Sequence, residues 1–181
     1  MTTNLYVDET KAKGYLVVAA TTGASSGDLA VIRKEIKTLL LPGQRSLHMK
    51  SEKDQRRVKI ADTFAAMAAL GVRAIVYDAG RGGKELERRS RAIEALVENA
   101  ASMPGPVRIT FDLDETVMGL DQQQMIELTR QRDLKEQISY THQHRHSEPL
   151  LAIPDAIAWC WARGGRWRDR VRPLVTEINT I

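Results

Sequence analysis

The sequence predicts a single α/β domain built on a mixed five-stranded sheet that is flanked by helices. Apolar runs at residues 4–9 and 15–22 are separated by a short turn, which favours an antiparallel hairpin. Three further runs, at residues 72–78, 106–112 and 136–146, alternate with helical patterns, which favours parallel pairing. A chain of 181 residues with 43% hydrophobic content suits one ordinary core, so we expect residues 1–181 to form one domain.

Apolar residues at helical spacing predict two helices between the hairpin and the third strand. Ser25 or Ser26 is placed to cap the first helix, whose apolar stripe reaches Leu40. The second helix starts at Ser51 and continues to Gly71, because glycine commonly follows a helix end.

The second half of the chain carries three more helical patterns. Residues 81–100 and 119–133 each form an amphipathic stretch, and Asp121 is a candidate cap for the later one. A further helix begins around Pro154 and is ended by paired glycines. Residues 173–181 fit either a strand or a frayed helix.

Composition excludes several classes of protein. The single cysteine, Cys160, excludes an internal disulfide and a paired-cysteine metal or redox motif, which favours a reducing compartment. No apolar run is long enough to cross a membrane, and the polar opening is not typical of a signal peptide. We therefore expect a cytoplasmic protein with no membrane contact.

The distribution of charge favours a polyanionic partner. The formal net charge is +4, and most of the excess lies in residues 161–181, which contain five arginines. In this segment the arginines alternate with tryptophans, a composition suited to binding phosphates and stacking bases. The candidate nucleic-acid-binding residues are Arg163, Arg166, Trp167 and Arg168. Trp159 and Trp161 fit the core of the late helix equally well.

Three aspartates occupy positions from which they can meet. Asp8 closes the first strand, Asp112 closes the fourth, and Asp155 lies in the first turn of the late helix. If the first and fourth strands are parallel neighbours, their carboxyl ends coincide, and a helix across the sheet adds the third carboxylate. Such a cluster repels itself unless a cation neutralises it, and oxygen ligands suit Mg²⁺ or Mn²⁺. These metals support phosphodiester hydrolysis.

Three motifs resemble a known family. The opening "LYVDET", the segment "SLHMKSE" and the late stretch "HSEPLLAIPDAIAWCW" are similar, in this order, to the bacterial domain of unknown function 3800. That family is regarded as ribonuclease H-like, so the resemblance implies a ribonuclease H-like domain and a nuclease active site. The implied catalytic residues are Asp8, Asp112 and Asp155, which would also hold the metal, with Glu9 and His48 as accessories.

Strand geometry limits which acidic residues can act together. Adjacent residues of a strand point to opposite faces, so Asp8 and Glu9 cannot both contact one metal ion unless the strand has ended, and Asp8 is favoured. Asp114 or Glu115 would replace Asp112 if the fourth strand ran further.

Two other groups of charged residues have simpler interpretations. Arg88, Arg89 and Arg91 alternate with glutamates, which is typical of a solvent-facing helix surface. His142 and the two histidines that follow at every second position resemble the spacing of strand-borne zinc sites, but no further ligand is evident. A solvent-facing polar edge is the preferred interpretation of these histidines.

The leading hypothesis is a divalent-metal-dependent nuclease whose partner is nucleic acid, and both RNA and DNA fit it. One alternative is a non-catalytic module on the same scaffold that binds nucleic acid or another partner. A third hypothesis is a haloacid-dehalogenase-like phosphatase that uses Asp112 and Asp114 of the stretch "DLDET". In those enzymes the nucleophile follows the first strand, whereas Asp112 ends the fourth.

Overall fold

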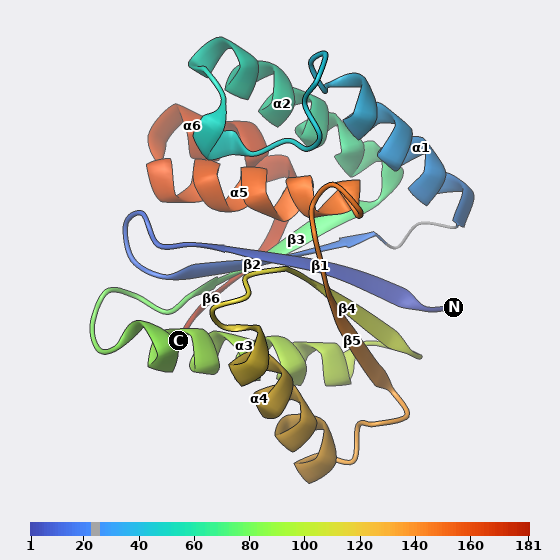
Figure 1. Ribbon diagram of the computed structural model, residues 1–181, viewed down its shortest axis with the longest axis vertical. Coiled ribbons are helices and arrows are strands. Elements are labelled where there is room, and N and C mark those ends of the chain that lie inside the picture. Colours follow the sequence, from blue (N-terminus) through green and yellow to red (C-terminus); the bar gives the residue numbers. More distant parts are fainter. Residues whose placement is uncertain (23–25) are drawn as a thin grey trace.

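The computed structural model describes residues 1–22 and 26–181. Its strands are β1 (Thr3–Thr10), β2 (Leu16–Thr22), β3 (Val72–Asp78), β4 (Val107–Asp112), β5 (Ile138–Gln143) and β6 (Val175–Thr180). Its α-helices are α1 (Ser26–Thr38), α2 (Asp54–Ala66), α3 (Glu85–Ser102), α4 (Met118–Gln131), α5 (Ala152–Arg163) and α6 (Gly165–Val171). Short 3-10 helices are η1 (Met49–Ser51), η2 (Met67–Leu70), η3 (Pro149–Leu151) and η4 (Arg172–Leu174). Figure 1 shows three layers, with α1, α2, α5 and α6 on one side of the sheet and α3 and α4 on the other.

The sheet is mixed, and its central strands place β1 beside β4. The order is β5-β4-β1-β2-β3-β6. β2 is antiparallel to β1 and β3, whereas β1 and β4, β4 and β5, and β3 and β6 are parallel. Val7 of β1 pairs with Phe111 of β4, so these two strands end at the same edge. This parallel neighbourhood confirms the condition on which the meeting of Asp8 and Asp112 depended.

The prediction of five strands is wrong, because the described residues form a six-stranded sheet. The additional strand is β6, in the segment for which the sequence left strand and helix open. Most β6 side chains are exposed, so the strand carries little apolar pattern. Its position is set by backbone pairing with the edge of β3.

The turn between β1 and β2 requires glycine at one position. Gly14 has a φ of +125°, and a Cβ placed there would lie 3.0 Å from the carbonyl oxygen of Gly80. The next residue, Tyr15, donates its N–H to that same carbonyl at 2.8 Å. The hairpin turn is thereby joined to the end of β3, which fixes the carboxyl end of β1 at the edge where the candidate site lies.

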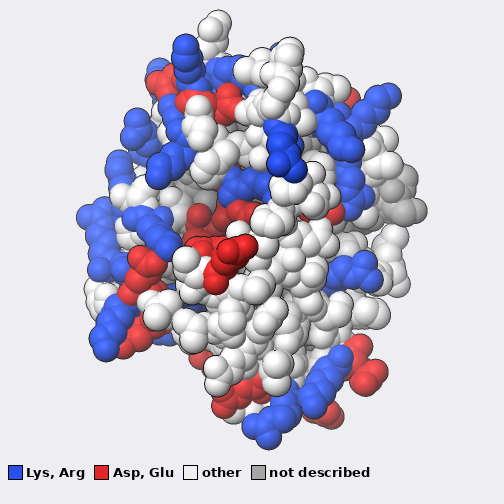
Figure 2. Space-filling model, viewed as in Figure 1, with Lys and Arg blue, Asp and Glu red and all other residues white. Residues whose placement is uncertain are grey.

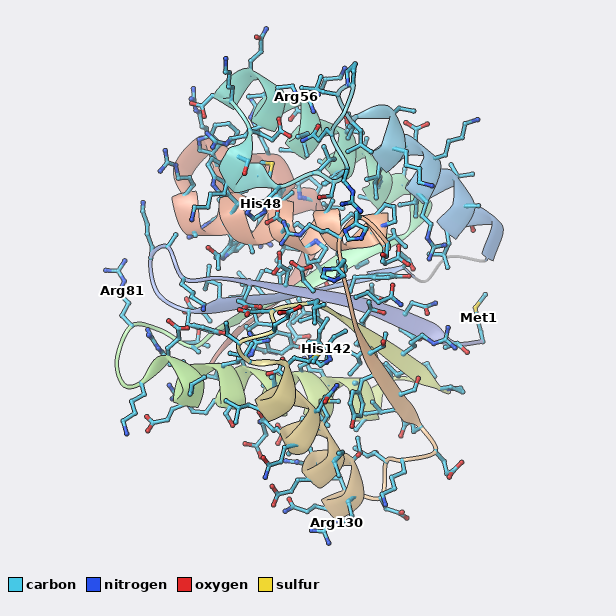
Figure 3. All side chains as sticks on the ribbon, in the orientation of Figure 1. Met1, His48, Arg56, Arg81, Arg130 and His142 are labelled. Carbon is cyan, nitrogen blue, oxygen red and sulfur yellow. The ribbon has the colours of Figure 1, made fainter. Side chains whose placement is uncertain are left out.

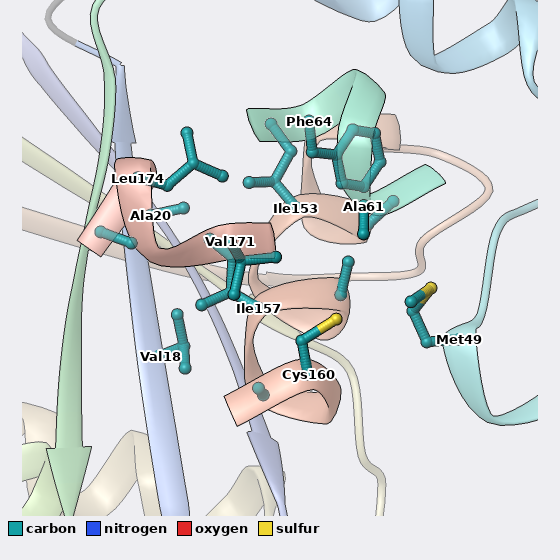
Figure 4. Close-up of a cluster of buried hydrophobic side chains, with 14 of the residues drawn as sticks. Val18, Ala20, Met49, Ala61, Phe64, Ile153, Ile157, Cys160, Val171 and Leu174 are labelled. Carbon is teal, nitrogen blue, oxygen red and sulfur yellow. The ribbon is translucent and has the colours of Figure 1, made fainter. Parts of the chain in front are cut away.

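Each face of the sheet has its own apolar core. Leu5 and Val7 of β1 pack toward α3 and α4, whereas Tyr6 between them packs toward α5, as strand alternation requires. Figure 4 shows the α5 side, where Ile157 and Cys160 contact residues of α2, α6 and β2. Each such side chain contributes about 1.5–3 kcal/mol on burial. This packing fixes α5 against the sheet.

Helix α5 matches its prediction closely. It begins at Ala152, so Pro154 lies in its first turn, and it ends at Arg163 before Gly164, whose φ of +74° stops the helix. Almost every residue of α5 is buried, because β1 and β2 cover one side and α2 and α6 another. Asp155 is the buried charged residue of α5, whose other charged residue, Arg163, is exposed at the end of the helix.

Several predicted helix boundaries differ from the structure. The helix expected from Ser51 to Gly71 is α2, which is shorter and is flanked by η1 and η2. Asp121 is not a cap, because α4 begins at Met118 and Asp121 is buried within it. Of the two predicted caps of the first helix, Ser25 lies outside the described residues, and Ser26 is the first residue of α1. Among the described helices, none has the length and apolar character needed to cross a membrane.

Candidate functional site

Three acidic side chains from separate parts of the chain meet at Arg145. Asp8 comes from β1, Asp112 from the end of β4, and Asp155 from the first turn of α5. Nη2 of Arg145 lies 3.0 Å from Oδ2 of Asp8, and Nε lies 3.0 Å from Oδ2 of Asp112. Nη1 lies 3.1 Å from Oδ1 of Asp155. The structure thus brings the three predicted carboxylates together, and we call these four residues the acidic cluster.

Asp155 is held by the segment that leads into η1. Its Oδ2 accepts the backbone N–H of Met49 at 2.8 Å, and its Oδ1 lies 3.0 Å from Nδ1 of His48. The His48 side chain is 43% exposed, whereas that of Asp155 is 9% exposed. His48 also contacts the Arg145 guanidinium. His48 is therefore a partly exposed imidazole fixed beside the acidic cluster, at the place where the family resemblance put it.

Burial and neighbouring charges shift Asp8 and Asp155 in opposite directions. Burial raises the pKa of Asp8 well above its ordinary value, and the negative charge of Asp155 adds to this against the effect of Arg145. Burial also acts to raise the pKa of Asp155, but the hydrogen bond with His48 and the charge of Arg145 outweigh it and lower the pKa. Two adjacent carboxyl groups with separated pKa values suit acid and base roles.

A cavity of about 660 Å³ leads to the acidic cluster from solvent. His48 and Trp159 border it, and its charged lining consists of two lysines and three acidic residues: Lys11, Lys50, Glu9, Asp114 and Asp155. Figure 2 shows acidic side chains gathered near the middle of this face, with basic side chains around them. A polyanion attracted by the basic surroundings would reach the carboxylates at the centre.

The acidic cluster matches a divalent cation in donor type. Carboxylate oxygens are the ligands that Mg²⁺ and Mn²⁺ prefer. Within residues 1–22 and 26–181, however, no group of three or more His, Cys, Asp or Glu side chains is arranged to hold a metal ion. The Arg145 guanidinium lies among the three carboxylates instead. The residues fit a metal ion in the chemistry of their oxygen atoms, and Arg145 occupies the position between them.

Glu9 belongs to a different charged group. Its Oε1 lies 2.8 Å from Nη1 of Arg89 on α3, so its carboxylate is directed away from Asp8, as the strand pleat requires. Arg89 also binds Asp121 through Nε and Nη2, at 2.8 and 2.7 Å, and donates to the Tyr15 hydroxyl at 2.9 Å. Glu9 borders the cavity, but the structure does not bring its carboxylate to the acidic cluster.

The interpretation of Arg88, Arg89 and Arg91 as a solvent-facing surface is wrong for Arg89, which is only 5% exposed. Its position faces the sheet, on the same side of α3 as the buried Ala92 and Ile93. The buried charge is balanced by Glu9 and Asp121. The spacing of Arg89 from these apolar residues is the signal in the sequence that could have identified it.

The three alternating histidines do not share one face. His142 lies in β5, is buried, and has its Nε2 3.2 Å from Oδ2 of Asp121. Its ring stacks on Phe111 with a centroid separation of 5.1 Å. His144 and His146 follow the end of β5 and stack on each other at 5.0 Å. The prediction of a solvent-facing polar edge is therefore wrong for His142.

The sheet separates the two charged groups. Figure 3 shows His48 on the α5 side of the sheet and His142 on the side of α3 and α4. Glu9, Arg89, Asp121 and His142 form what we call the second network. Burial acts to raise the pKa of Asp121, but Arg89 and His142 outweigh it and lower the pKa. This network joins β1, α3, α4 and β5 on the face opposite the acidic cluster.

The predicted nucleic-acid-binding residues lie beside the cavity wall formed by Trp159. The guanidinium of Arg163 lies 5.3 Å from the Trp159 ring centroid. Trp167 is buried and meets Trp159 edge-on at 5.0 Å, which leaves its ring no face for a base. Arg166 lies over Trp167, and Arg168 donates to the Trp161 carbonyl at 2.9 Å. Arg163 is the member of this set next to a residue of the cavity.

Arg145 is the residue of the acidic cluster that was not predicted from the sequence. This residue lies in the turn between β5 and η3, flanked by His144 and His146, and no local pattern distinguishes it from a surface arginine. Its proximity to the late motif is the only signal that could have drawn attention to it.

Comparisons with known proteins add no assignment to this geometry. No protein-family model matches the chain. A search of curated proteins also finds no match. The function is therefore argued from the arrangement of the residues.

Proposed function

We propose that the protein is a divalent-metal-dependent nuclease that hydrolyses phosphodiester bonds of nucleic acid at the acidic cluster. The single observation that carries this proposal is the convergence of Asp8, Asp112 and Asp155 on one guanidinium beside a cavity. Carboxylates gathered from distant parts of a chain are costly unless a cation compensates them, so their position calls for a functional explanation.

We include the finer fold assignment, a ribonuclease H-like domain, in this proposal. It is supported by the parallel pairing of β1 and β4, which places Asp8 and Asp112 at one edge, and by α5 packed across β1. These are the positions that the resemblance to the domain of unknown function 3800 implied for the acidic residues.

Asp8, Asp112 and Asp155 are the residues that would hold Mg²⁺ or Mn²⁺. When bound, such an ion would supply charge neutralisation and Lewis-acid activation of water. His48, held by Asp155 at the cavity, is the group placed to accept or deliver a proton. Lys11 and Lys50 line the same cavity and would bind the phosphates of the substrate.

One observation favours the alternative of a non-catalytic binding module. Arg145 already compensates the three carboxylates, so the acidic cluster can exist without a metal ion. The lysines that line the cavity, Lys11 and Lys50, would then bind a polyanion that is not cleaved. The phosphatase hypothesis has less support, because Asp114 accepts hydrogen bonds from the backbone and hydroxyl of Thr116 at 2.9 and 2.6 Å.

Cleavage assays separate these functions. Labelled single- and double-stranded RNA and DNA, and a chromogenic phosphate monoester, are incubated with the protein in Mg²⁺, Mn²⁺ or chelator. We expect metal-dependent cleavage of a polynucleotide. Asp8→Asn, Asp112→Asn and Asp155→Asn should each lower it by about 100-fold or more, since even the outer partners of metal ligands are worth about 10- to 100-fold.

Asp62→Asn is the matched control, because Asp62 pairs with Arg170 on the surface of α2, away from the acidic cluster. It should leave cleavage unchanged. Retarded migration of nucleic acid without cleavage would replace the nuclease by the binding module. Release of phosphate that depends on Asp112 and Asp114 but not on Asp155 would instead identify a phosphatase.

A further inference from the structure

Arg145 binds the same carboxylate oxygens that a shared metal ion would need. Oδ1 of Asp8 accepts the backbone N–H of Glu9 at 2.8 Å, and Oδ2 of Asp155 accepts that of Met49 at 2.8 Å. The opposite oxygen of each carboxylate is left to face the centre of the acidic cluster, and both of these oxygens contact Arg145. A guanidinium and a metal ion therefore compete for the same lone pairs.

The formal charges leave the acidic cluster short of positive charge. Three carboxylates surround one guanidinium, and Asp8 and Asp155 are only 6% and 7% exposed. An ion with two positive charges compensates this cluster better than a guanidinium does, and its radius lets three oxygens approach more closely. A divalent cation would therefore balance three ionised carboxylates better than the guanidinium of Arg145 does.

The backbone around Arg145 is held in place on both sides of the turn that carries this residue. The turn that carries it is closed by a hydrogen bond from the Ser147 N–H to the His144 carbonyl at 2.9 Å. After the turn, Glu148 binds Arg33 of α1 through two contacts of 3.1 and 2.9 Å. The Arg145 side chain is 15% exposed, so part of it borders solvent, and displacement requires the guanidinium to rotate outward while this turn stays closed.

We propose that Arg145 is a built-in counter-ion that a divalent cation must displace from Asp8, Asp112 and Asp155. This inference rests on the proposed function of the acidic cluster. It makes the metal site conditional, because the protein binds a cation only in the fraction of molecules whose guanidinium has swung out. The apparent dissociation constant is raised by the reciprocal of that fraction. Removing the guanidinium should therefore strengthen metal binding.

Titration calorimetry with Mn²⁺ and thermal unfolding in Mn²⁺ or chelator test this proposal without any substrate. We expect Arg145→Gln to bind Mn²⁺ about tenfold or more tightly than the wild type. In chelator, its melting temperature should be lower than that of the wild type, because the carboxylates lose their counter-ion. Addition of Mn²⁺ should raise the melting temperature of this variant more than that of the wild type. Arg145→Lys keeps one positive charge without the planar fork, and should be intermediate.

Arg132→Gln is the matched control, because Arg132 also joins two carboxylates, Glu94 and Glu98, but on an exposed surface. It should leave Mn²⁺ affinity unchanged. The gain in Arg145→Gln should disappear when Asp155→Asn is added, which would locate the ion at the acidic cluster. If Arg145→Gln does not fold, the intermediate affinity expected of Arg145→Lys carries the test.

Three outcomes would overturn the inference: equal Mn²⁺ affinity with and without the guanidinium, no Mn²⁺ binding in any variant, or a gain that survives Asp155→Asn. The proposed nuclease activity is judged separately. Tighter Mn²⁺ binding by Arg145→Gln, together with no cleavage of any polynucleotide by the wild type, would support the displaced counter-ion and remove the nuclease. Cleavage by the wild type, with a Mn²⁺ affinity equal to that of Arg145→Gln, would support the nuclease and remove the displaced counter-ion.

Discussion

Asp8 and Asp155 are both almost fully buried, yet the neighbouring groups affect them differently. Asp155 has a backbone donor and His48 to compensate its charge, and its pKa is lowered. Asp8 has the Glu9 N–H and one nitrogen of Arg145, and its pKa is raised because burial and the charge of Asp155 dominate. Ionisation of Asp8 is therefore less favourable in the folded protein than in the unfolded chain.

We expect Asp8→Asn to stabilise the metal-free protein at pH 7 and Asp155→Asn to destabilise it. Asn at position 8 keeps an oxygen for the Glu9 N–H and removes a buried negative charge, so the free energy of unfolding should rise by about 0.5–2 kcal/mol. Asn at position 155 weakens favourable charged hydrogen bonds and should cost about 1–3 kcal/mol. Urea denaturation in chelator measures both changes.

The pH dependence of stability follows from the raised pKa of Asp8 and the lowered pKa of Asp155. The folded pKa of Asp8 is raised. Its contribution to the free energy of unfolding is therefore fully present below the ordinary aspartate pKa of about 3.9, and it is lost as the pH rises through the folded pKa. For Asp155 the contribution is present above about 3.9 and is lost as the pH falls through the lowered pKa. A gain from Asp8→Asn that persisted undiminished at pH 3 would contradict this account.

Cys160 should be chemically inert in the folded protein. It is fully buried in α5, and burial raises the pKa of its thiol to about 12. Since the thiolate is the reactive form, we expect no reaction with a disulfide reagent at pH 8 until the protein is unfolded in denaturant. The chain has one cysteine, so the released chromophore reports this residue alone. Rapid reaction without denaturant would show that α5 separates readily from the sheet.

At the scale of elements, the second network couples α3 to α4 through buried charge. Removing one partner leaves the other charge buried and unpaired, so Arg89→Met should cost about 3–5 kcal/mol of unfolding free energy. Arg89→Met combined with Asp121→Leu should cost less than the sum of the single changes, because the uncompensated charge is gone. Urea denaturation of the four proteins in this cycle measures the coupling.

Arg132→Gln provides the contrast, because Arg132 follows α4 and binds Glu94 and Glu98 of α3 on the surface. Exposed pairs of this kind are worth about 0–1 kcal/mol. Equal costs for Arg89→Met and Arg132→Gln would show that burial does not set the strength of the second network.

Elements with a strong local pattern were predicted well, and edge elements were not. The central strands β1 and β2 are buried on both faces and appear as continuous apolar runs, and α5 is mostly apolar with clear start and stop residues. Edge strand β6 has mostly exposed side chains, and β5 ends three residues before the alternation in its sequence does. At the edges of the sheet, a strand is held by backbone pairing with one neighbour, so its side-chain pattern is a weak predictor of where it begins and ends.

At the scale of the whole molecule, the basic side chains at the cavity should determine the binding of a polyanion. Lys11, Lys50 and Arg163 lie at or beside this cavity. Replacing each with Gln should weaken nucleic-acid binding. Each phosphate contact that is lost should reduce the slope of log affinity against log salt by about 0.7–0.9. Fluorescence anisotropy with labelled RNA and DNA over a salt series, in chelator, measures the slope.

Lys135→Gln is the control for this series, because Lys135 is an exposed residue between α4 and β5 and carries the same charge. It should leave the slope unchanged. A triple substitution at the cavity with no more effect than Lys135→Gln would move the nucleic-acid interface to another face.

The sequence by itself determined the central strands, the late helix and the places in the chain from which three carboxylates meet. Apolar runs specify β1 and β4, the pairing rules for parallel strands bring their carboxyl ends together, and an apolar helix fixes Asp155 near them. Each of these inferences uses a local pattern and a general rule of chain geometry.

The tertiary structure alone decided what surrounds those carboxylates. Arg145 contacts Asp8 across 137 positions of the chain and His48 across 97, and Arg89 contacts Asp121 across 32. A charged side chain in a turn or on a helix looks the same in sequence whether it faces water or a buried partner. Periodicity records which face of an element is apolar, whereas the pairing of buried charges depends on how distant elements pack together.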